Sequence, residues 1–384
     1  MLTVLRNGSV YAPRPLGRQS VLLTDGKIAR IGDVDVRAVE ALGVDSDIVD
    51  VDGCIVAPGL IDPHIHLLGG SGEAGFSTQS PEFFVSEIVS SGITTVVGTL
   101  GVDTTMQNMS ALLGRAKALS NDGLTTCIWS GGYNVPPSTI MNSIREDVMF
   151  IDEVIGAGEV AVSDERGLNQ SAQELAKMVR DTNVGGHLTG KAGVTHFHVG
   201  EEDTRLAPLF DIIEDFQVKP EWLYPTHVAR TEKLLDEAVA LVHQGATVDI
   251  DVVDQKLGKW VRYYLENGGR PDRLTVSSDS DSSTPDVYWN QLCQLVVKLG
   301  MPLEQMLAFA TTNVARVLKL APKGRVAEGC DADLLVLGQG SLEMREVIAR
   351  GKRLVVDGEP VVRESFLEKS SRKWHLVGDK APED

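Results

Sequence analysis

The amino-acid sequence predicts an α/β protein in which a (β/α)8 TIM barrel is flanked by a small β-sandwich domain built from both ends of the chain. Three observations lead to this prediction. Hairpin signals crowd the first 57 residues, eight short apolar runs then alternate with segments of helical period, and strand-like segments return after residue 321. Eight strands that alternate with helices are typical of a closed parallel barrel.

The first 57 residues contain short strand-like segments separated by turn signals. Apolar and polar residues alternate around Asn7-Gly8 and Asp25-Gly26, and a further apolar run is interrupted by Asp52-Gly53. Asn-Gly and Asp-Gly between alternating apolar residues are strong hairpin signals. No segment of helical period interrupts them, so residues 1–57 are expected to form the first part of the β-sandwich.

Residues 58–321 are expected to form the barrel. Most of the apolar runs are hydrophobic on both faces, as in parallel strands that are covered by helices. Segment 231–243 carries Leu and Val at helical spacing, and segment 301–320 is also helical in character. The eight predicted strands are 60–66, 94–99, 125–130, 159–163, 194–199, 223–227, 247–251 and 274–279.

Residues 322–384 are expected to complete the β-sandwich. The segments GRVAEGCDADLLVLG and VIARGKRLVVDGEPVV have the β character of the amino-terminal segments. The charged tail from Glu368 is expected to fray.

Composition and charge exclude several classes of function. The chain has 384 residues, with 36 Lys and Arg against 54 Asp and Glu, which gives a formal net charge of −18. Without a concentrated basic stretch, this charge argues against binding nucleic acid or an anionic membrane. The sequence contains no run of about 18 apolar residues, which a membrane-spanning helix would need, and the first residues lack the apolar run of a secretory signal. The four cysteines include no CxxC pair. We therefore expect a cytoplasmic protein with reduced thiols.

Histidines gather at the carboxyl ends of the predicted strands, where barrel enzymes place their active sites. In the sequence His64-Ile65-His66 the two imidazoles face the same way, because side chains alternate along a strand. A lone HxH is weak evidence, since most such histidines are packed or solvated. The grouped donors without thiolates nevertheless suit Zn²⁺ or another divalent first-row ion. Further donors on the other strands are His196, His198, His227, Asp279 and, at the start of the fourth strand, Glu159.

Several longer motifs extend this pattern. PGLIDPHIHLLGG and GRVAEGCDADLLVL resemble the amidohydrolase superfamily. More narrowly, HIHLLGGSGEAG, SGGYNVPPSTI, SDERG, GVTHFHVGE, PTHVAR and SSDSDSS resemble the isoaspartyl (β-aspartyl) dipeptidases. The resemblance runs from about residue 1 to residue 365.

The resemblance implies a centre of two divalent metal ions, with Zn²⁺ expected. At the bridging position the dipeptidases carry a carboxylated lysine, whereas this chain has Glu159. A glutamate still offers one oxygen to each ion; the alternative is that the bridge is lost and one ion binds. His196 and His198 face the same way, which leaves His196 either as a support for a ligand or as a packed residue. The implied ligands are His64, His66, Glu159, His198, His227 and Asp279.

The resemblance also implies a site for a dipeptide zwitterion. Glu73 would bind the α-ammonium group, and Arg166 and Arg230 would hold carboxylates. Tyr133 would steady the developing oxyanion, although each of these residues also has an ordinary surface or core interpretation. Two departures concern the leaving-group side: Val102 replaces a family threonine, and the loop from residue 283 to 289 is short. Further hydrogen bonds would come from Ser71 and Ser283.

The implied reaction is hydrolysis of a β-aspartyl dipeptide by a hydroxide that bridges the two metals. Asp279 would act as general base and then as general acid. Alternatives in the same class are a cyclic-amide hydrolase of the dihydroorotase or hydantoinase kind and an N-acyl amino acid deacylase. A non-catalytic barrel retained for assembly is the alternative of another class. The resemblance suggests a homo-oligomer, and the expected partner is a small-molecule substrate.

Overall fold

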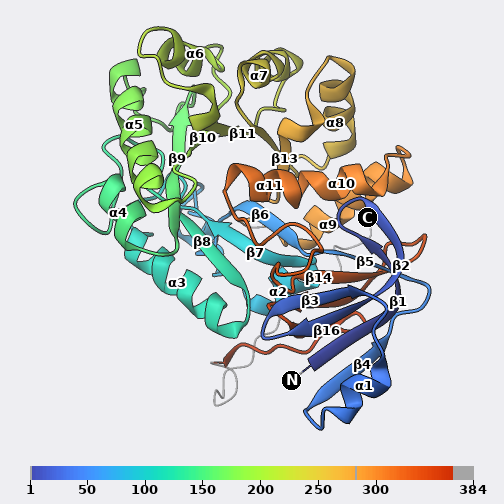
Figure 1. Cartoon of the computed structure of the whole chain (residues 1–384). Helices are drawn as coiled ribbons and strands as arrows, with labels where there is room; N and C mark the ends of the chain where they lie inside the picture. Colours follow the sequence, from blue (N-terminus) through green and yellow to red (C-terminus); the bar gives the residue numbers. More distant parts are fainter. Residues whose placement is uncertain (1, 282, 366–384) are drawn as a thin grey trace, which may run out of the picture.

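Both ends of the chain contribute to one sheet of nine strands (Figure 1). The computed structural model describes residues 2–281 and 283–365. The carboxyl-terminal strand β14 pairs antiparallel with β5, which in turn pairs with β1. Both termini thus meet as expected, but the two stacked layers of a β-sandwich are not confirmed. The strands are β1 (Leu2–Tyr11), β2 (Pro15–Thr24), β3 (Lys27–Gly32), β4 (Ser46–Asp50), β5 (Cys54–Pro58), β14 (Leu334–Gly338), β15 (Met344–Ala349), β16 (Lys352–Val356) and β17 (Glu359–Pro360).

The three predicted hairpin turns have different outcomes. Asp25 and Gly26 have φ angles of 48° and 72° and join the antiparallel strands β2 and β3, as a two-residue hairpin requires. Asn7-Gly8 lies inside β1 at a register shift, so the hairpin prediction there is wrong. A Cβ on Gly8 would lie 2.6 Å from Val56 Cγ2, and this close approach requires glycine. Asp52-Gly53 connects β4 to β5, which both run parallel to β1, so no hairpin forms there.

The expected barrel strands are all present. Six of them form one parallel sheet in the order β11-β10-β9-β8-β7-β6, and β12 pairs with β13. After β13, Asp279 N donates to His64 O and His66 N donates to Ser280 O, both at 3.0 Å. These bonds connect the last strand to the first, which is consistent with a TIM barrel. The strands are β6 (Leu60–Ile65), β7 (Ile93–Gly98), β8 (Thr125–Ser130), β9 (Val154–Val162), β10 (Thr195–Val199), β11 (Leu223–Thr226), β12 (Val248–Asp251) and β13 (Leu274–Ser277).

Helices follow most of the barrel strands and lie on their outer side (Figure 1). The Ser171 hydroxyl accepts from Glu174 N–H in a capping box at the start of α5, and the Thr231 hydroxyl accepts from Leu234 N–H at the start of α7. The predicted helix at 231–243 is confirmed, whereas 301–320 divides into α10 and α11. The helices are α1 (Val36–Ala41), α2 (Val85–Ser90), α3 (Met109–Asp122), α4 (Ile144–Phe150), α5 (Ala172–Thr189), α6 (Ala207–Glu214), α7 (Glu232–Gln244), α8 (Leu257–Glu266), α9 (Asp286–Val297), α10 (Leu303–Phe309) and α11 (Thr312–Val317).

The expectation of an amino-terminal segment without helices is wrong, and the expectation for the charged tail is not tested. A helix, α1, interrupts the amino-terminal strands, because Asp35 caps it by accepting from the N–H groups of Arg37 and Ala38. The predicted charged tail from Glu368 lies outside the described residues. Within residues 2–281 and 283–365, no helix has the length and apolar character needed to cross a bilayer.

Candidate metal and substrate site

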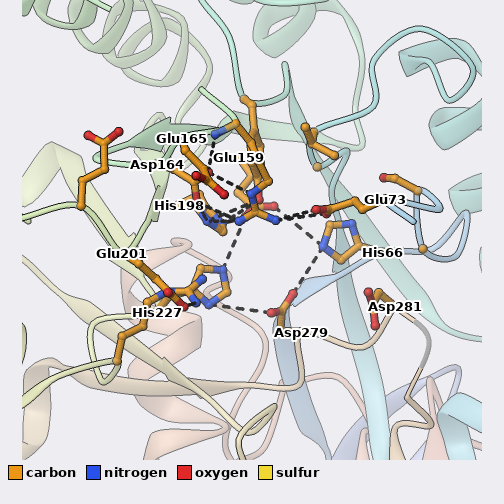
Figure 2. Close-up of a pocket in the computed structure, with 18 residues that line it drawn as sticks. His66, Glu73, Glu159, Asp164, Glu165, His198, Glu201, His227, Asp279 and Asp281 are labelled. Carbon is orange, nitrogen blue, oxygen red and sulfur yellow. Dashed lines mark hydrogen bonds and ion pairs between the residues drawn. The ribbon is translucent and has the colours of Figure 1, made fainter. Parts of the chain in front are cut away.

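A cavity of about 560 Å³ opens at the carboxyl ends of the barrel strands (Figure 2). Acidic and imidazole side chains from both sides of the barrel point into it. This is the end at which barrel enzymes carry out their chemistry. The residues labelled in Figure 2 line the cavity: His66, Glu73, Glu159, Asp164, Glu165, His198, Glu201, His227, Asp279 and Asp281.

The HxH motif and the aspartate after β13 form one compact group. His64 Nε2 lies 3.4 Å from His66 Nε2, and Asp279 Oδ1 lies 3.2 and 3.3 Å from these two nitrogens. Two ligand atoms that share a tetrahedral Zn²⁺ are about 3.4 Å apart, because each lies roughly 2.0–2.2 Å from the ion. The three atoms therefore have the spacing of ligands to one metal ion.

Glu159 lies between this group and the other two predicted ligands. Its Oε2 is 3.2 Å from His64 Nε2, while its Oε1 is 2.5 Å from His198 Nδ1 and 3.5 Å from His227 Nε2. One oxygen thus faces each side of the centre, as a bridging ligand requires. Glu159 lies within β9, which begins at Val154, five residues earlier than expected.

Glycines allow β9 to pass close to its neighbour β10. A Cβ on Gly156 would lie 2.3 Å from Val194 O, and one on Gly158 would lie 2.8 Å from His196 Cβ. Real side chains do not tolerate such contacts, so a larger residue at either position would push β9 outward. The backbone at Glu159 is therefore placed by two residues that lack side chains.

The donor set fits the divalent metal ions that the amidohydrolase resemblance implies. The side chain of Glu159 is 1% exposed, and its Oε2 makes no acceptable hydrogen bond to any described residue. His64 Nε2 lies 3.2 Å away as an ion-pair partner, but a buried carboxylate oxygen that accepts no hydrogen bond is costly, and a metal cation would satisfy it. Among the described residues, three groups of donor atoms each lie within 4.8 Å of one another: His64, His66 and Asp279; His64, Glu159 and His227; and His227, Asp251 and Asp279.

The charges of these groups depend on one another. Burial alone would lower the pKa of His64, but the carboxylates of Glu159 and Asp279 outweigh it and raise that pKa well above its usual value. Burial is likewise outweighed at His227, where Asp279 and Asp251 raise the pKa to about 9. Burial would raise the pKa of Glu159, but the positive charge of His64 and His198 keeps it well below its usual value. Mutual attraction thus keeps the carboxylates ionised, and metal binding would release protons from the imidazoles, because a ligand histidine must be neutral.

His196 supports a predicted ligand and does not line the cavity. Its Nε2 lies 2.9 Å from His64 Nδ1, and its Nδ1 lies 2.9 Å from the carbonyl oxygen of Tyr224. Its ring stacks on Trp129 with the centroids 5.1 Å apart. Burial lowers the pKa of His196, so the ring is neutral. With its proton on Nδ1, His196 accepts from His64 Nδ1 and leaves His64 Nε2 facing Glu159.

Three of the substrate residues implied by the resemblance line the cavity and contact other residues there. Arg166 donates to both oxygens of Glu73, at 3.0 and 3.1 Å, and to Asp164. Tyr133 Oη lies 3.0 Å from His198 Nδ1. Burial is the main reason that the pKa of Tyr133 is raised well above its usual value, so the hydroxyl keeps its proton.

Of the remaining predicted substrate residues, Arg230 and Ser71 line the cavity and Ser283 does not. Arg230 lines the cavity and donates from Nε to Val199 O at 2.9 Å. Ser71 also lines it, as does Val102. Ser283 is exposed and is not among the described residues that line the cavity, so its predicted substrate contact is not supported.

Two acidic residues near the ligands escaped the sequence reasoning. Asp164 Oδ2 lies 2.9 Å from His198 Nε2, and Asp251 Oδ2 lies 2.8 Å from His227 Nδ1. Both had an available signal, because Asp164 belongs to the SDERG motif and Asp251 ends the seventh predicted strand. Burial would raise the pKa of each, but hydrogen bonds from Arg166 to Asp164 and from His227 to Asp251 lower both values.

Known proteins resemble this chain in sequence and in fold. The model of the amidohydrolase family matches residues 55–361. A β-aspartyl dipeptidase from Fervidobacterium islandicum AW-1 is 38% identical, with a TM-score of 0.88 over 94% of this chain and 98% of that one. Its complex with the β-Asp-Leu dipeptide is 36% identical, with the same TM-score, over 94% and 97%. Allantoinase from Bacillus licheniformis is 23% identical over 87% of this chain and 86% of its own.

Proposed function

The chain belongs to the amidohydrolase family and is a hydrolase of C–N bonds, and from this premise we propose that it is a β-aspartyl (isoaspartyl) dipeptidase. The observation that carries the proposal is the pairing of Glu73 with Arg166 in the cavity that Arg230 also lines. A β-aspartyl dipeptide carries one ammonium group and two carboxylates. These three side chains offer one complementary charge to each.

Two divalent metal ions, with Zn²⁺ expected, belong to the proposal. The residues that would hold them are His64, His66, His198 and His227, with Asp279 and the bridging Glu159. When bound, such ions polarise an amide carbonyl and bring the pKa of water down to about 7.

The side chains of the chain then have distinct tasks in amide hydrolysis. Asp279 is 19% exposed and reaches the cavity, so it can take a proton from the attacking water and pass it to the leaving amine. The attack forms a bond from the water oxygen to the β-carbonyl carbon, and the C–N bond then breaks. Tyr133 keeps its proton and can donate it as a hydrogen bond to the developing oxyanion.

Charged groups at the ends of the substrate would hold the scissile bond in register with Asp279. Glu73 would bind the α-ammonium group and Arg166 the neighbouring carboxylate, which requires the two side chains to separate. Arg230 would bind the carboxylate of the leaving residue. A homo-oligomeric state and a cytoplasmic location remain predictions.

A turnover panel tests the proposal. Protein loaded with Zn²⁺ would be given β-Asp-Leu, α-Asp-Leu, dihydroorotate, allantoin and an N-acetyl amino acid, and product formation would be followed for each. We expect β-Asp-Leu to have the highest kcat/KM. Faster turnover of either ring substrate would favour a cyclic-amide hydrolase, and faster turnover of the acyl amino acid would favour a deacylase.

A further inference from the structure

Asp251 is an acidic residue at the metal centre to which the proposed reaction gives no task. It is the last residue of β12, the seventh barrel strand. Its Oδ2 lies 2.8 Å from His227 Nδ1, and its Oδ1 accepts from Val253 N–H at 3.0 Å. Both oxygens of the carboxylate are therefore engaged, and the side chain is 16% exposed. Asp251 is thus anchored by its own loop on one side and contacts a predicted metal ligand on the other.

The two nitrogens of His227 face different partners. Nδ1 faces Asp251, whereas Nε2 lies 3.5 Å from Glu159 Oε1. A neutral imidazole carries a proton on one nitrogen and a lone pair on the other. If the proton is held at Nδ1 by Asp251, the lone pair on Nε2 faces Glu159 and the metal centre.

A second arrangement must be weighed, because His227, Asp251 and Asp279 could themselves hold an ion. That arrangement uses Nδ1 as a ligand, and a nitrogen cannot bind an ion and a proton in the same direction. The distances favour the proton. The separation of 2.8 Å between Asp251 Oδ2 and His227 Nδ1 is that of a hydrogen bond, and Nε2, which lies 3.5 Å from Glu159 Oε1, is the nitrogen that faces the other predicted ligands. Asp279 Oδ2, at 3.8 Å, is beyond hydrogen-bond distance of Nδ1.

The backbone conformation of His227 also needs support from neighbouring residues. Its φ angle is 62°, in the left-handed region that costs residues other than glycine about 1–2 kcal/mol. Such a conformation persists only when its surroundings fix it. The side chain is 3% exposed, and the contact with Asp251 fixes the ring from the side opposite Glu159.

We infer that Asp251 is a positioning residue that holds the proton of His227 on Nδ1 and thereby reserves Nε2 for a metal ion. The inference rests on the metal centre of the proposed function, but it does not depend on which amide is hydrolysed. Residues that orient a ligand histidine in this way typically contribute 10–100-fold to metal affinity.

The test measures Zn²⁺ binding by the metal-free full-length chain, by competition with a chromophoric chelator, and Zn²⁺ content at saturation by elemental analysis. We expect D251A to bind the ion at His227 about 10–100-fold more weakly but to reach the wild-type content at saturation. D251N should recover most of the affinity, because its amide oxygen can still accept from Nδ1–H. The visible spectrum of the Co²⁺-loaded protein should be restored by D251N as well.

A matched control removes a different carboxylate charge from the same small cavity. Asp254 lines a small cavity together with His227 and Asp251, but its carboxylate accepts from Trp260 Nε1 at 2.9 Å. D254N should keep wild-type Zn²⁺ affinity. A loss of Zn²⁺ content at saturation in D251N would overturn the inference in favour of Asp251 as a ligand. Equal affinities of D251A and the wild type, or an equal loss in D254N, would also overturn it.

The test separates this inference from the substrate proposal. If β-Asp-Leu is not hydrolysed but Zn²⁺ binding follows the expected order, only the substrate assignment fails. If the wild-type chain binds no Zn²⁺, the metal centre and this inference fail together.

Discussion

Arg166 donates from Nη1 to both carboxylate oxygens of Glu73 in the lining of the cavity, at 3.1 and 3.0 Å. The two side chains are 33% and 52% exposed, so water weakens the pair and its separation costs little. Arg166 is also held by two hydrogen bonds to Asp164, at 2.9 and 2.8 Å. Glu73 is therefore the partner that can move away, and a zwitterionic substrate can replace each charge with its own.

We expect E73Q to lower kcat/KM for β-Asp-Leu by about 10–100-fold, because a hydrogen bond to a charged group contributes roughly 1.5–3 kcal/mol. Succinyl-leucine, which lacks the α-ammonium group, should be hydrolysed equally by E73Q and the wild type. Steady-state rates on both substrates check this. E202Q is the control, since Glu202 also lines the cavity. An equal loss on both substrates would contradict the assignment of Glu73 to the ammonium group.

We expect D279N to retain nearly the wild-type metal content while losing turnover. The amide keeps an oxygen that can face His64 and His66, but it cannot accept and pass on a proton. Removal of a general acid and base lowers rates by about 10²–10⁴-fold. Elemental analysis and a β-Asp-Leu assay on the same sample check both parts. Retained activity would falsify the role of Asp279 as general base and acid. A loss of metal in D279N would mean that the main task of Asp279 is to bind metal.

Replacement of the central carboxylate should reduce the number of bound ions. Among the described carboxylates, Glu159 alone has an oxygen within 4 Å of a ring nitrogen of each of His64, His66, His198 and His227. E159Q keeps the size of the side chain but removes the charge and one lone-pair-bearing oxygen. We expect the Zn²⁺ content to fall from two ions per chain to one or fewer, measured after dialysis. A content of two ions in E159Q would contradict the bridge.

Much of this site could be predicted because strand ends are local features. His64, His66, His198 and His227 follow apolar runs, and parallel strands bring their carboxyl ends to one rim. The contacts of Asp251 and Asp164 could not be predicted in the same way. The SDERG motif and the end of the seventh predicted strand mark these two residues, but their partners depend on how neighbouring strand ends are aligned and on the rotamers of facing side chains.

The errors in the predicted secondary structure have a similar physical origin. Asn7-Gly8 carries the turn signal of a hairpin, yet the same tolerance of positive φ serves a bulge within β1, where Asn7 has a φ of 68°. Only the close approach of Val56 from another strand distinguishes the two. Helix α1 is six residues long, too short for its period to stand out among strands.

Ion pairs at Asp331 join the amino-terminal and carboxyl-terminal parts of the chain. Asp331 accepts from Lys27 Nζ on β3 at 2.5 Å and lies 2.9 Å from Lys323 Nζ. Burial would raise the pKa of Asp331, but the hydrogen bonds from Lys27 and Lys323 outweigh it and lower that pKa. A lowered pKa means that the folded state favours the ionised carboxylate. The pairing therefore stabilises the fold above the unfolded value near pH 4, and this contribution is lost as the pH falls further.

We therefore expect D331N to lower the thermal unfolding midpoint by about 2–4 °C at pH 6–7. The difference from the wild type should shrink as the pH falls below about 4, because the wild-type carboxylate then takes up its proton. Calorimetric scans across this pH range check the sign. The control is D272N, which breaks the exposed pair of Asp272 with Arg270 and should leave the midpoint nearly unchanged. A D331N difference that grows as the pH falls would mean that the carboxyl group stabilises the fold in its protonated form, contrary to the geometry of the two lysines.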